Sequence, residues 1–150
     1  MCFVTRDLST ARRIPGPFDR ILSIDSLYFT DDIHRTVALL HDALAPDGRL
    51  GVLASEVLPA DGSDPGPRAT PMHRAMVAAG FAVRVTDVTR HEHRIWRRQA
   101  EVVRGLEAAF EAEGNGQLAL ELRREGERSL GWIEEDRIRR YLYVARPARA

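Results

Sequence analysis

The chain has 150 residues, 44% of them hydrophobic, and its 22 basic and 22 acidic side chains cancel to a formal net charge of zero. This length fits one globular domain with a real core, and the charge balance argues against a nucleic-acid partner or an anionic membrane surface. The single cysteine, Cys2, excludes an internal disulfide, and no apolar run is long enough to span a bilayer. Because the opening MCFVTRDL also lacks the character of a secretory signal, we expect a cytoplasmic protein.

The first half of the chain predicts strands that alternate with helices. Residues 2–5 are a short β-prone run, and the nearly continuous apolar character of 20–26 predicts a strand covered on both faces. Asp31 or Asp32 can cap a helix over 33–44, which the following Pro-Asp-Gly ends.

A second buried strand is expected over 49–58, followed by a polar Pro/Gly/Asp loop over 59–68. Thr70 and the following proline open a short helix that closes at Gly80. The alternation of apolar and polar residues over 81–86 predicts a strand with unlike faces, near a sheet edge.

Two long helices and a last strand complete the pattern. A helix is expected over 89–113, with an inward stripe of Ile95, Gln99, Val102, Leu106, Ala109 and Phe110. Gly114-Asn115-Gly116 breaks it, a second helix runs to about residue 130 with Leu118 and Leu122 inward, and 138–145 has strong strand composition. The formal dinucleotide-type phrase GNGQLA (114–119) follows a helix rather than a strand, so we interpret it as a helix break.

This order predicts an α/β fold with a mostly parallel sheet and helices on both faces. In such sheets ligands bind at the carboxyl ends of the strands. The phrase SIDSLYF (23–29) lies at the end of the predicted strand 20–26 and is therefore the first candidate site.

Several phrases carry a family resemblance in their order and spacing: FDRILSIDSLYF, then a helix, LAPDGRLGVL, a small helix ending AAGF, and a last strand RYLYVARP. Together they resemble the C-terminal part of a class I S-adenosylmethionine-dependent methyltransferase. The resemblance implies an incomplete Rossmann-like sheet, with residues 1–150 as a single partial domain and a helical insert at about 89–130 that covers the acceptor.

The resemblance also implies residue roles. Asp7 would reach the adenine amino group and Leu8 would pack by the ring; Ser23, Ile24 and Asp25 would line the methionine side of S-adenosylmethionine; Tyr28 and Phe29 would wall the acceptor pocket. Two alternatives stay open: Tyr28 and Phe29 plug the top of the sheet against the helix at 33–44, or Asp25 is a helix or turn cap.

The catalytic candidates are Asp25, Tyr28 and His34, and the sequence does not choose among them. Other candidate bases are Glu56, His73, His91 and His93. No metal site is expected, because His91 and His93 lie two apart without a third ligand at metal spacing. The Asn/Asp-Pro-Pro-aromatic signature of enzymes that methylate base or amide nitrogens is replaced by IDSLYF, which favours a small-molecule acceptor.

The glycine-rich loop and the ribose-binding acid of the family have no counterpart in this sequence. We therefore expect methyl transfer to be impaired in this chain alone, and expect strand 20–26 to pair with a second copy or with a complementing chain. The alternative function is a non-catalytic remnant or partner subunit that acts by association. An oxidoreductase of the related nucleotide-binding type is disfavoured, because a Tyr-x-x-x-Lys pair requires lysine and all 22 bases are arginine.

Overall fold

The computed structural model describes residues 5, 7–59 and 61–148, which form two compact units. The sheet unit holds residues 7–56, 65–87 and 141–148; the hairpin unit holds 57–64 and 88–140. The predicted strand at 2–5 lies outside the described residues, apart from Thr5, which is exposed and has no regular structure.

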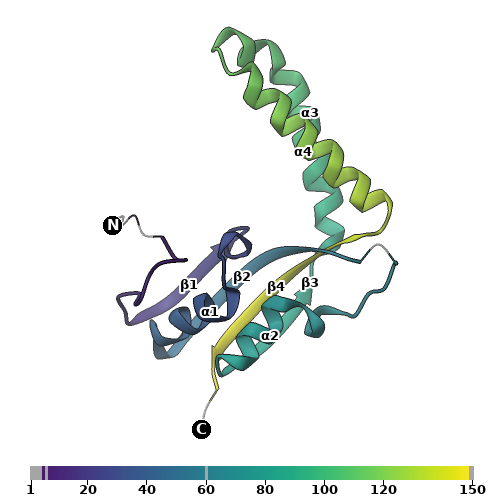
Figure 1. Cartoon of the computed structure of the whole chain (residues 1–150). Helices are drawn as coiled ribbons and strands as arrows, with labels where there is room; N and C mark the ends of the chain where they lie inside the picture. The colour runs from purple at the N-terminus through teal and green to yellow at the C-terminus, as the bar shows by residue number, and fades with distance from the viewer. Residues whose placement is uncertain (1–4, 6, 60, 149–150) are drawn as a thin grey trace. The chain divides into compact units, whose positions relative to one another are not determined.

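Four strands form one sheet (Figure 1): β1 (Phe18–Ile24), β2 (Leu44–Val57), β3 (Phe81–Asp87) and β4 (Ile138–Pro147), in the order β1-β2-β4-β3. β1 and β2 are parallel, whereas β3 and β4 are antiparallel. The predicted α/β fold is confirmed, and its mostly parallel sheet is confirmed only in part. β3 lies at an edge of the described sheet, as its alternating pattern predicts.

Two helices of the sheet unit follow the predicted capping residues. Asp32 accepts a hydrogen bond from the Arg35 amide (3.0 Å) at the start of α1 (Ile33–Asp42), and Thr70 accepts one from the His73 amide (3.1 Å) at the start of α2 (Pro71–Ala78). Short 3₁₀ turns, η1 (Leu27–Phe29) and η2 (Pro67–Ala69), precede them. α1 is shorter than predicted because Leu44 already pairs with Phe18 in the β1–β2 ladder.

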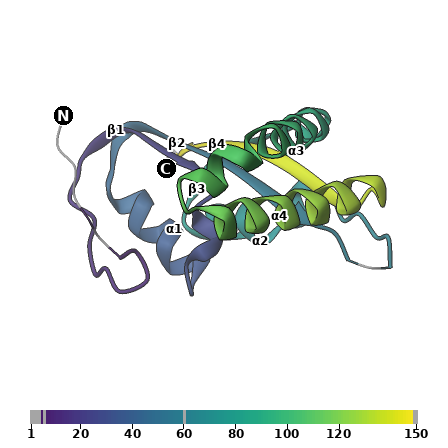
Figure 2. The same ribbon diagram turned by 90° about the horizontal axis from the view of Figure 1, so that it is seen from above.

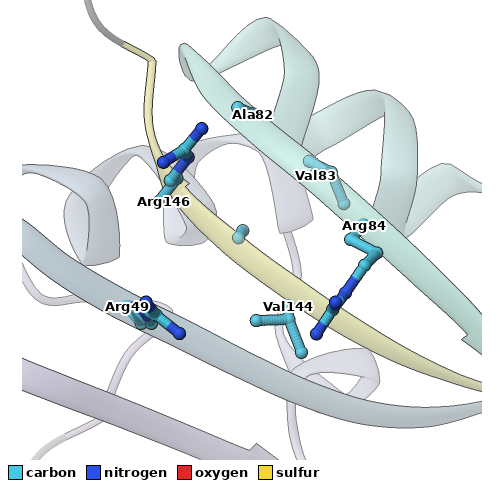
Figure 3. Close-up of a pocket in the computed structure, with 7 residues that line it drawn as sticks. Arg49, Ala82, Val83, Arg84, Val144 and Arg146 are labelled. Carbon is cyan, nitrogen blue, oxygen red and sulfur yellow. The ribbon is translucent and has the colours of Figure 1, made fainter.

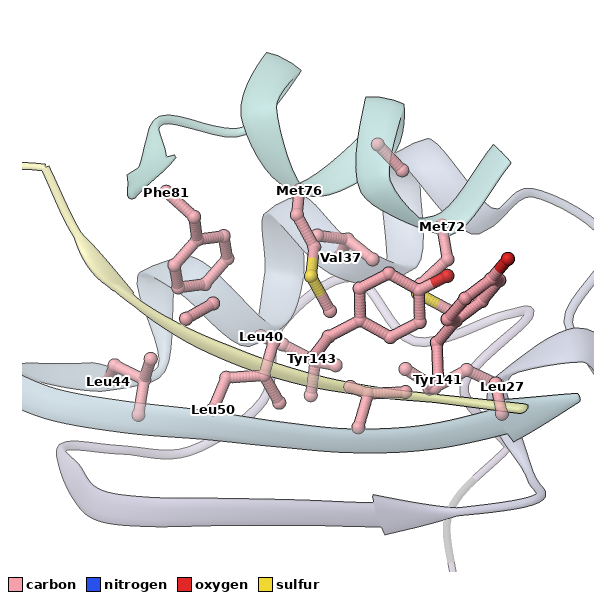
Figure 4. Packing of buried hydrophobic residues seen from close by; sticks show 14 residues of the cluster. Leu27, Val37, Leu40, Leu44, Leu50, Met72, Met76, Phe81, Tyr141 and Tyr143 are labelled. Carbon is pink, nitrogen blue, oxygen red and sulfur yellow. The ribbon is translucent and has the colours of Figure 1, made fainter. Parts of the chain in front are cut away.

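The core of the sheet unit lies between the sheet and these two helices, which cover the same face (Figures 2 and 4). Its buried residues come from η1, from both helices and from the inward positions of β2, β3 and β4: Leu27, Val37, Leu40, Leu44, Leu50, Val52, Ala54, Met72, Ala75, Met76, Phe81, Tyr141, Tyr143 and Ala145. This packing fixes which face of each strand is buried. Because side chains alternate along a strand, it also fixes which of them point to the core and which point away.

The prediction that strand 20–26 is covered on both faces is wrong. The strand spans 18–24, and although Ser23 is buried, Leu22 and Ile24 are 69% and 55% exposed. α1 and α2 pack on the face toward which Ser23 points, and the alternate side chains of a strand point the other way. An apolar run therefore leaves half of its side chains on an exposed face here.

In the hairpin unit, α3 (Thr89–Ala112) and α4 (Gly116–Glu134) pack against each other, and Gly114, with φ 73°, breaks the helix as predicted. The predicted stripe is wrong in part: Ile95, Val102 and Leu106 are 41–49% exposed, and Leu118 is 46% exposed. The buried positions are Glu92, Val103, Ala119, Gly126, Ser129 and Ile133. Two packed helices bury only a narrow stripe of each other's surface. On α4 this stripe includes the small residues Ala119, Gly126 and Ser129.

A buried ion pair joins α3 to the first residues of β4 within the hairpin unit. Glu92 is 1% exposed, and its Oε1 accepts hydrogen bonds from Arg140 Nη1 and Trp96 Nε1, each at 3.0 Å. The Arg140 amide donates to Thr89 Oγ1 at 2.9 Å. Arg140, which lies near the start of β4, thereby fixes the first turn of α3.

Candidate functional site

A pocket of about 270 Å³ opens at the carboxyl ends of β1 and β2, where the α/β pattern predicts a ligand. Its lining comes from η1, α1, the end of β2 and the start of α2: Leu27, Tyr28, Thr30, Asp31, Ile33, Ala54, Ser55, Glu56, Pro71 and Met72. The floor is apolar, and Tyr28, Asp31 and Glu56 supply polar groups. We call this the carboxyl-end pocket.

A tight turn carries the chain from β1 to this pocket. The hydroxyls of Ser23 and Ser26 lie 2.7 Å apart, and the Asp25 amide donates to the carbonyl of Leu53 at 3.0 Å, which extends the parallel ladder by one bond. Asp25 has φ 48°, a left-handed conformation that aspartate tolerates better than most residues. The sharp reversal sends Leu27 into the core and Tyr28 to the pocket wall.

Tyr28 and Phe29 lie on the surface beside the pocket. Their ring centroids are 4.5 Å apart with an interplanar angle of 52°, and the residues are 52% and 77% exposed. Such exposure contradicts the alternative that they plug the top of the sheet, a role that the buried Leu27 takes instead. Two adjacent exposed rings next to a pocket form a surface available to a ligand.

Glu56, one of the candidate bases, lies at the end of β2 and lines the pocket. Burial raises the pKa of its carboxyl group above the ordinary 4.5. A carboxylate with a raised pKa is a better proton acceptor near neutral pH than an ordinary one. Nearby, burial also raises the pKa of Tyr143, whose hydroxyl is 2.9 Å from Thr70 Oγ1.

The segment that holds Asp7 and Leu8 is tied to α1 by Arg35. The guanidinium donates to the carbonyl of Ser9 at 2.6 Å and also to the carbonyl of Ala11. Arg35 lies in the first turn of α1, directly after η1. Its hydrogen bonds therefore hold the segment of Asp7 and Leu8 against the start of α1, beside the carboxyl-end pocket. Leu8 packs against the core of the sheet unit.

The Asp7 carboxylate accepts hydrogen bonds within the turn that it begins. Its two oxygens accept from the Ser9 amide (2.8 Å) and from Thr10 Oγ1 (3.1 Å), and its carbonyl accepts from the Ala11 amide (3.1 Å). A carboxylate used in this way fixes the turn that presents Leu8.

The histidines do not gather at the pocket. His34 is exposed on α1 and does not line it, whereas His73 is partly buried on α2. His91 and His93 belong to the hairpin unit. Among the described residues, no three His, Cys, Asp or Glu side chains lie close enough to hold a metal ion.

Sequence reasoning missed two residues that organise this region. Arg35 falls on a helix face where an arginine is expected to be solvated, and only its contacts with residues 26 and 24 positions earlier reveal its role. Tyr143 was assigned to a strand by composition alone, and a tyrosine hydroxyl that becomes fully buried in the core needs a partner. The pairing with Thr70 could not be found without the strand order.

Neither the known protein-family models nor the curated proteins include a match to this sequence. Solved structures do match it. A phosphoethanolamine N-methyltransferase of Haemonchus contortus, in complex with phosphomonomethylethanolamine and S-adenosylhomocysteine, aligns with a TM-score of 0.79 at 17% identity, over 95% of this chain and 36% of that one. The [4+2]-cyclase SpnF aligns at 0.75 and 19% identity, over 98% and 56%. The cyclopropane synthase MmaA2 of Mycobacterium tuberculosis aligns at 0.72 and 19% identity, over 88% and 56%.

These likenesses establish the fold. The chain has the Rossmann-like fold of class I S-adenosylmethionine-dependent methyltransferases, as the resemblance in sequence implies. It spans about one third to somewhat more than half of the length of these matching structures. No helix in the described part of the chain is long and apolar enough to cross a membrane.

Proposed function

We propose that this chain contributes to S-adenosylmethionine-dependent methyl transfer to a small-molecule acceptor, at the carboxyl-end pocket. The observation that carries the proposal is the meeting of acidic side chains and exposed aromatic rings at the ends of β1 and β2, in a chain with a methyltransferase fold. A small-molecule ligand of one neighbour, phosphomonomethylethanolamine, supports an acceptor of this class.

The chemistry of the donor set fits a sulfonium cofactor. Asp31 and Glu56 line the pocket and supply carboxylates, Asp25 lies in the turn between β1 and the pocket, and the faces of Tyr28 and Phe29 attract a cation. When bound, S-adenosylmethionine supplies an electrophilic methyl group. Ser23, Asp25 and the backbone of Ile24 would hold its methionine side, because the Ile24 side chain points to the opposite, exposed face of the sheet. Leu8 would pack against the adenine, with Asp7 at its amino group.

The acceptor is proposed to lie against Tyr28 and Phe29. The chain's part in the reaction is to hold it in line and, where it must lose a proton, to accept that proton. Glu56 is the best placed base because it lines the pocket and has a raised pKa, whereas His34 does not line it. Tyr28, which lines the pocket, and Asp25, in the turn that precedes it, remain catalytic candidates.

Weak cofactor binding by the chain alone is part of this proposal. The pocket, at about 270 Å³, is below the usual 300–1,000 Å³ of small-molecule sites, and the Asp7 carboxylate already accepts two hydrogen bonds. A hydrogen bond to a charged group of the cofactor is worth about 1.5–3 kcal/mol. The absence of two or three such bonds weakens cofactor binding by a factor on the order of thousands.

Isothermal titration with S-adenosylmethionine and S-adenosylhomocysteine tests both parts. Binding at a dissociation constant in the high micromolar or millimolar range is expected, and Ser23→Val and Asp25→Ala should weaken it further. Arg104→Ala, on α3, is the matched control and should leave it unchanged. The cofactor assignment fails if neither compound binds at millimolar concentration, and the impairment fails if the constant is low micromolar.

A second function, association as a non-catalytic subunit, is favoured by one feature of the sheet. In the described part of the chain, β1 has β2 on one side and no strand on the other, and an open strand edge is a template for another chain. A second copy or a complementing chain would pair there. A complex that forms with full stoichiometry while the carboxyl-end pocket binds no cofactor would favour this function.

A further inference from the structure

The charged side chains that line the carboxyl-end pocket are acidic. Asp31 comes from the start of α1 and Glu56 from the end of β2, and among the described residues no arginine or histidine lines the pocket with them. In the same part of the chain, neither carboxylate has an arginine or histidine nitrogen within 4.0 Å. A ligand in this pocket therefore meets negative charge that no basic side chain of these residues offsets.

Arginines of the sheet unit gather at a different place. Arg49, Arg84 and Arg146, from β2, β3 and β4, line a shallow depression of about 370 Å³ together with Val144 (Figure 3). Within the described ranges, no acidic side chain lines that depression. The zero net charge of the chain thus conceals a local separation, so the charge of a small ligand decides which of the two hollows it can enter.

The two helices that begin at the carboxyl-end pocket do not reverse its sign. Ile33 of α1, and Pro71 and Met72 of α2, line the pocket, so the amino-terminal ends of both helices lie at its wall. Each such end carries about half a positive charge, so two carboxylates outweigh the two ends roughly twofold. The side chains of Asp32 and Thr70 also accept a hydrogen bond from these first turns. An anionic group would therefore lose more to the carboxylates than it gains from the helices.

The aromatic rings beside the pocket favour the same ligand charge. Tyr28 lines the pocket, and its ring centroid lies 4.5 Å from that of Phe29. The face of an aromatic ring attracts an ammonium group within about 6 Å of its centroid. A neutral hydroxyl group gains no such attraction, and a carboxylate or phosphate is repelled. Rings and carboxylates thus select a cation.

We propose that the methyl acceptor is an amine that enters the carboxyl-end pocket as its ammonium ion, with the nitrogen beside Asp31 and Glu56 and its apolar part against Tyr28. This inference rests on the proposed function and deepens it, because it names the acceptor class of the same site. Acceptors with a carboxylate or phosphate head are excluded by charge. An alcohol would leave both carboxylates in the pocket without a counter-charge.

An ammonium nitrogen has no free electron pair, so it must lose a proton before it can be methylated. In the proposed step the N–H bond breaks, its electrons remain on nitrogen as a lone pair, and the Glu56 carboxylate takes the proton and becomes a carboxylic acid. That acid later releases the proton to water. Burial raises the pKa of Glu56, which makes it a better proton acceptor than an ordinary carboxylate. Asp31, which is exposed, supplies the second negative charge.

The test compares three probes of similar size and different charge: phenethylamine as its ammonium ion, phenethyl alcohol and phenylacetate. Each is titrated into the isotope-labelled full chain at neutral pH, and the amide chemical shifts of residues 27–33 and 54–56 are followed. We expect a millimolar dissociation constant for phenethylamine, at least about tenfold tighter than for phenylacetate, with the alcohol between them. Because the shifts are specific to each residue, phenylacetate bound beside Arg49, Arg84 and Arg146 is distinguished from phenylacetate in the pocket.

Two double variants make the same change in net charge. Asp31→Asn with Glu56→Gln should weaken phenethylamine at least about fivefold and leave phenethyl alcohol within about twofold. Asp19→Asn with Asp42→Asn, at exposed positions that do not line the pocket, should leave the affinities for all three probes unchanged.

Three results would overturn the amine assignment. They are equal binding of the three probes at the pocket, equal losses in both double variants, and no shift at the pocket with any probe at millimolar concentration. The titration contains no cofactor, so each of these results is separate from the titration with S-adenosylmethionine that tests the proposed function.

Discussion

The Tyr143 hydroxyl donates a hydrogen bond to Thr70 Oγ1 across 2.9 Å. The direction follows because the single hydrogen of the Thr70 hydroxyl goes to the carbonyl of Pro67 at 3.0 Å, while its oxygen also accepts from the His73 amide at 3.1 Å. One hydroxyl thus joins the inner face of β4 to the first turn of α2, which forms a wall of the carboxyl-end pocket.

Tyr143→Phe should remove one hydrogen bond and cost about 1 kcal/mol of unfolding free energy, or a fall in Tm of about 2–4 °C. Thr70→Ala should cost about 2–4 kcal/mol, because the helix cap is lost and the buried Tyr143 hydroxyl loses its acceptor. Urea unfolding of both variants measures the difference. Equal costs would show that the Thr70 cap contributes nothing to α2.

Glu56 should make stability depend on pH. Burial raises the pKa of its carboxyl group above 4.5, so the folded chain holds a proton that the unfolded chain releases, and stability falls as pH rises from about 4.5 through the folded pKa. Glu56→Gln should therefore raise Tm relative to the unmodified chain at pH 7, with a difference that shrinks toward pH 4. Glu125→Gln, at an exposed position, is the control and should show no such trend.

Tyr28 should distinguish a charged cofactor from its neutral product. Tyr28→Leu should weaken binding of S-adenosylmethionine about two- to tenfold, because a ring face attracts the sulfonium, and should leave S-adenosylhomocysteine nearly unchanged. Tyr28→Phe should restore the difference. As the side chain is half exposed, Tm should move by less than about 1–2 °C. Equal weakening of both compounds would place the ring outside the sulfonium's reach.

The chain should associate in solution through β1. Light scattering after size exclusion should give a mass that rises above 16.9 kDa with concentration. Leu22→Lys should return it to the monomer without unfolding, since this side chain is 69% exposed. Leu106→Lys, at a 46% exposed position of α3, is the control. A sharp monomer at every concentration would show that the edge of β1 does not pair.

Glu92 and Arg140 should contribute far more to stability than an exposed pair on the same helix. Glu92→Ala leaves a largely buried arginine without its carboxylate and should cost about 3–5 kcal/mol. Glu101→Ala breaks the exposed pair with Arg98, whose side chains are 60% and 73% exposed, and should cost at most about 1 kcal/mol. Hydrogen exchange of the α3 and α4 amides locates the loss in the hairpin unit.

The sequence predicted most of the elements because their signals are local. Asp32, Thr70 and Gly114 act within one turn of a helix, and each stands where capping or breaking chemistry requires. The resemblance to methyltransferases also depended on ordered phrases, and the structural likenesses confirm it at the level of fold. The positions of Ser23, Asp25 and Tyr28 at a strand end followed from the same order.

Burial could not be predicted in the same way. The apolar run in β1 indicates how apolar its side chains are, but not how many layers lie on the sheet, so Leu22 was assigned to a core that covers only one face. On α3 the apolar period does not reveal that Val103 is buried while its neighbour Val102 is exposed. Arg35 and Tyr143 act through partners distant in sequence, which no local pattern reveals.

The junction of the hairpin unit with the sheet has a consequence for how the fold can vary. The Val88 amide donates to the carbonyl of Arg140 at 2.8 Å, directly beyond the ladder pair of Asp87 and Tyr141. The segment 88–140 thus begins and ends at one hydrogen-bonded pair of residues, directly beyond the ladder of the antiparallel strands β3 and β4. Helices of other lengths, or a foreign domain, can be grafted between these two residues without a shift in strand register.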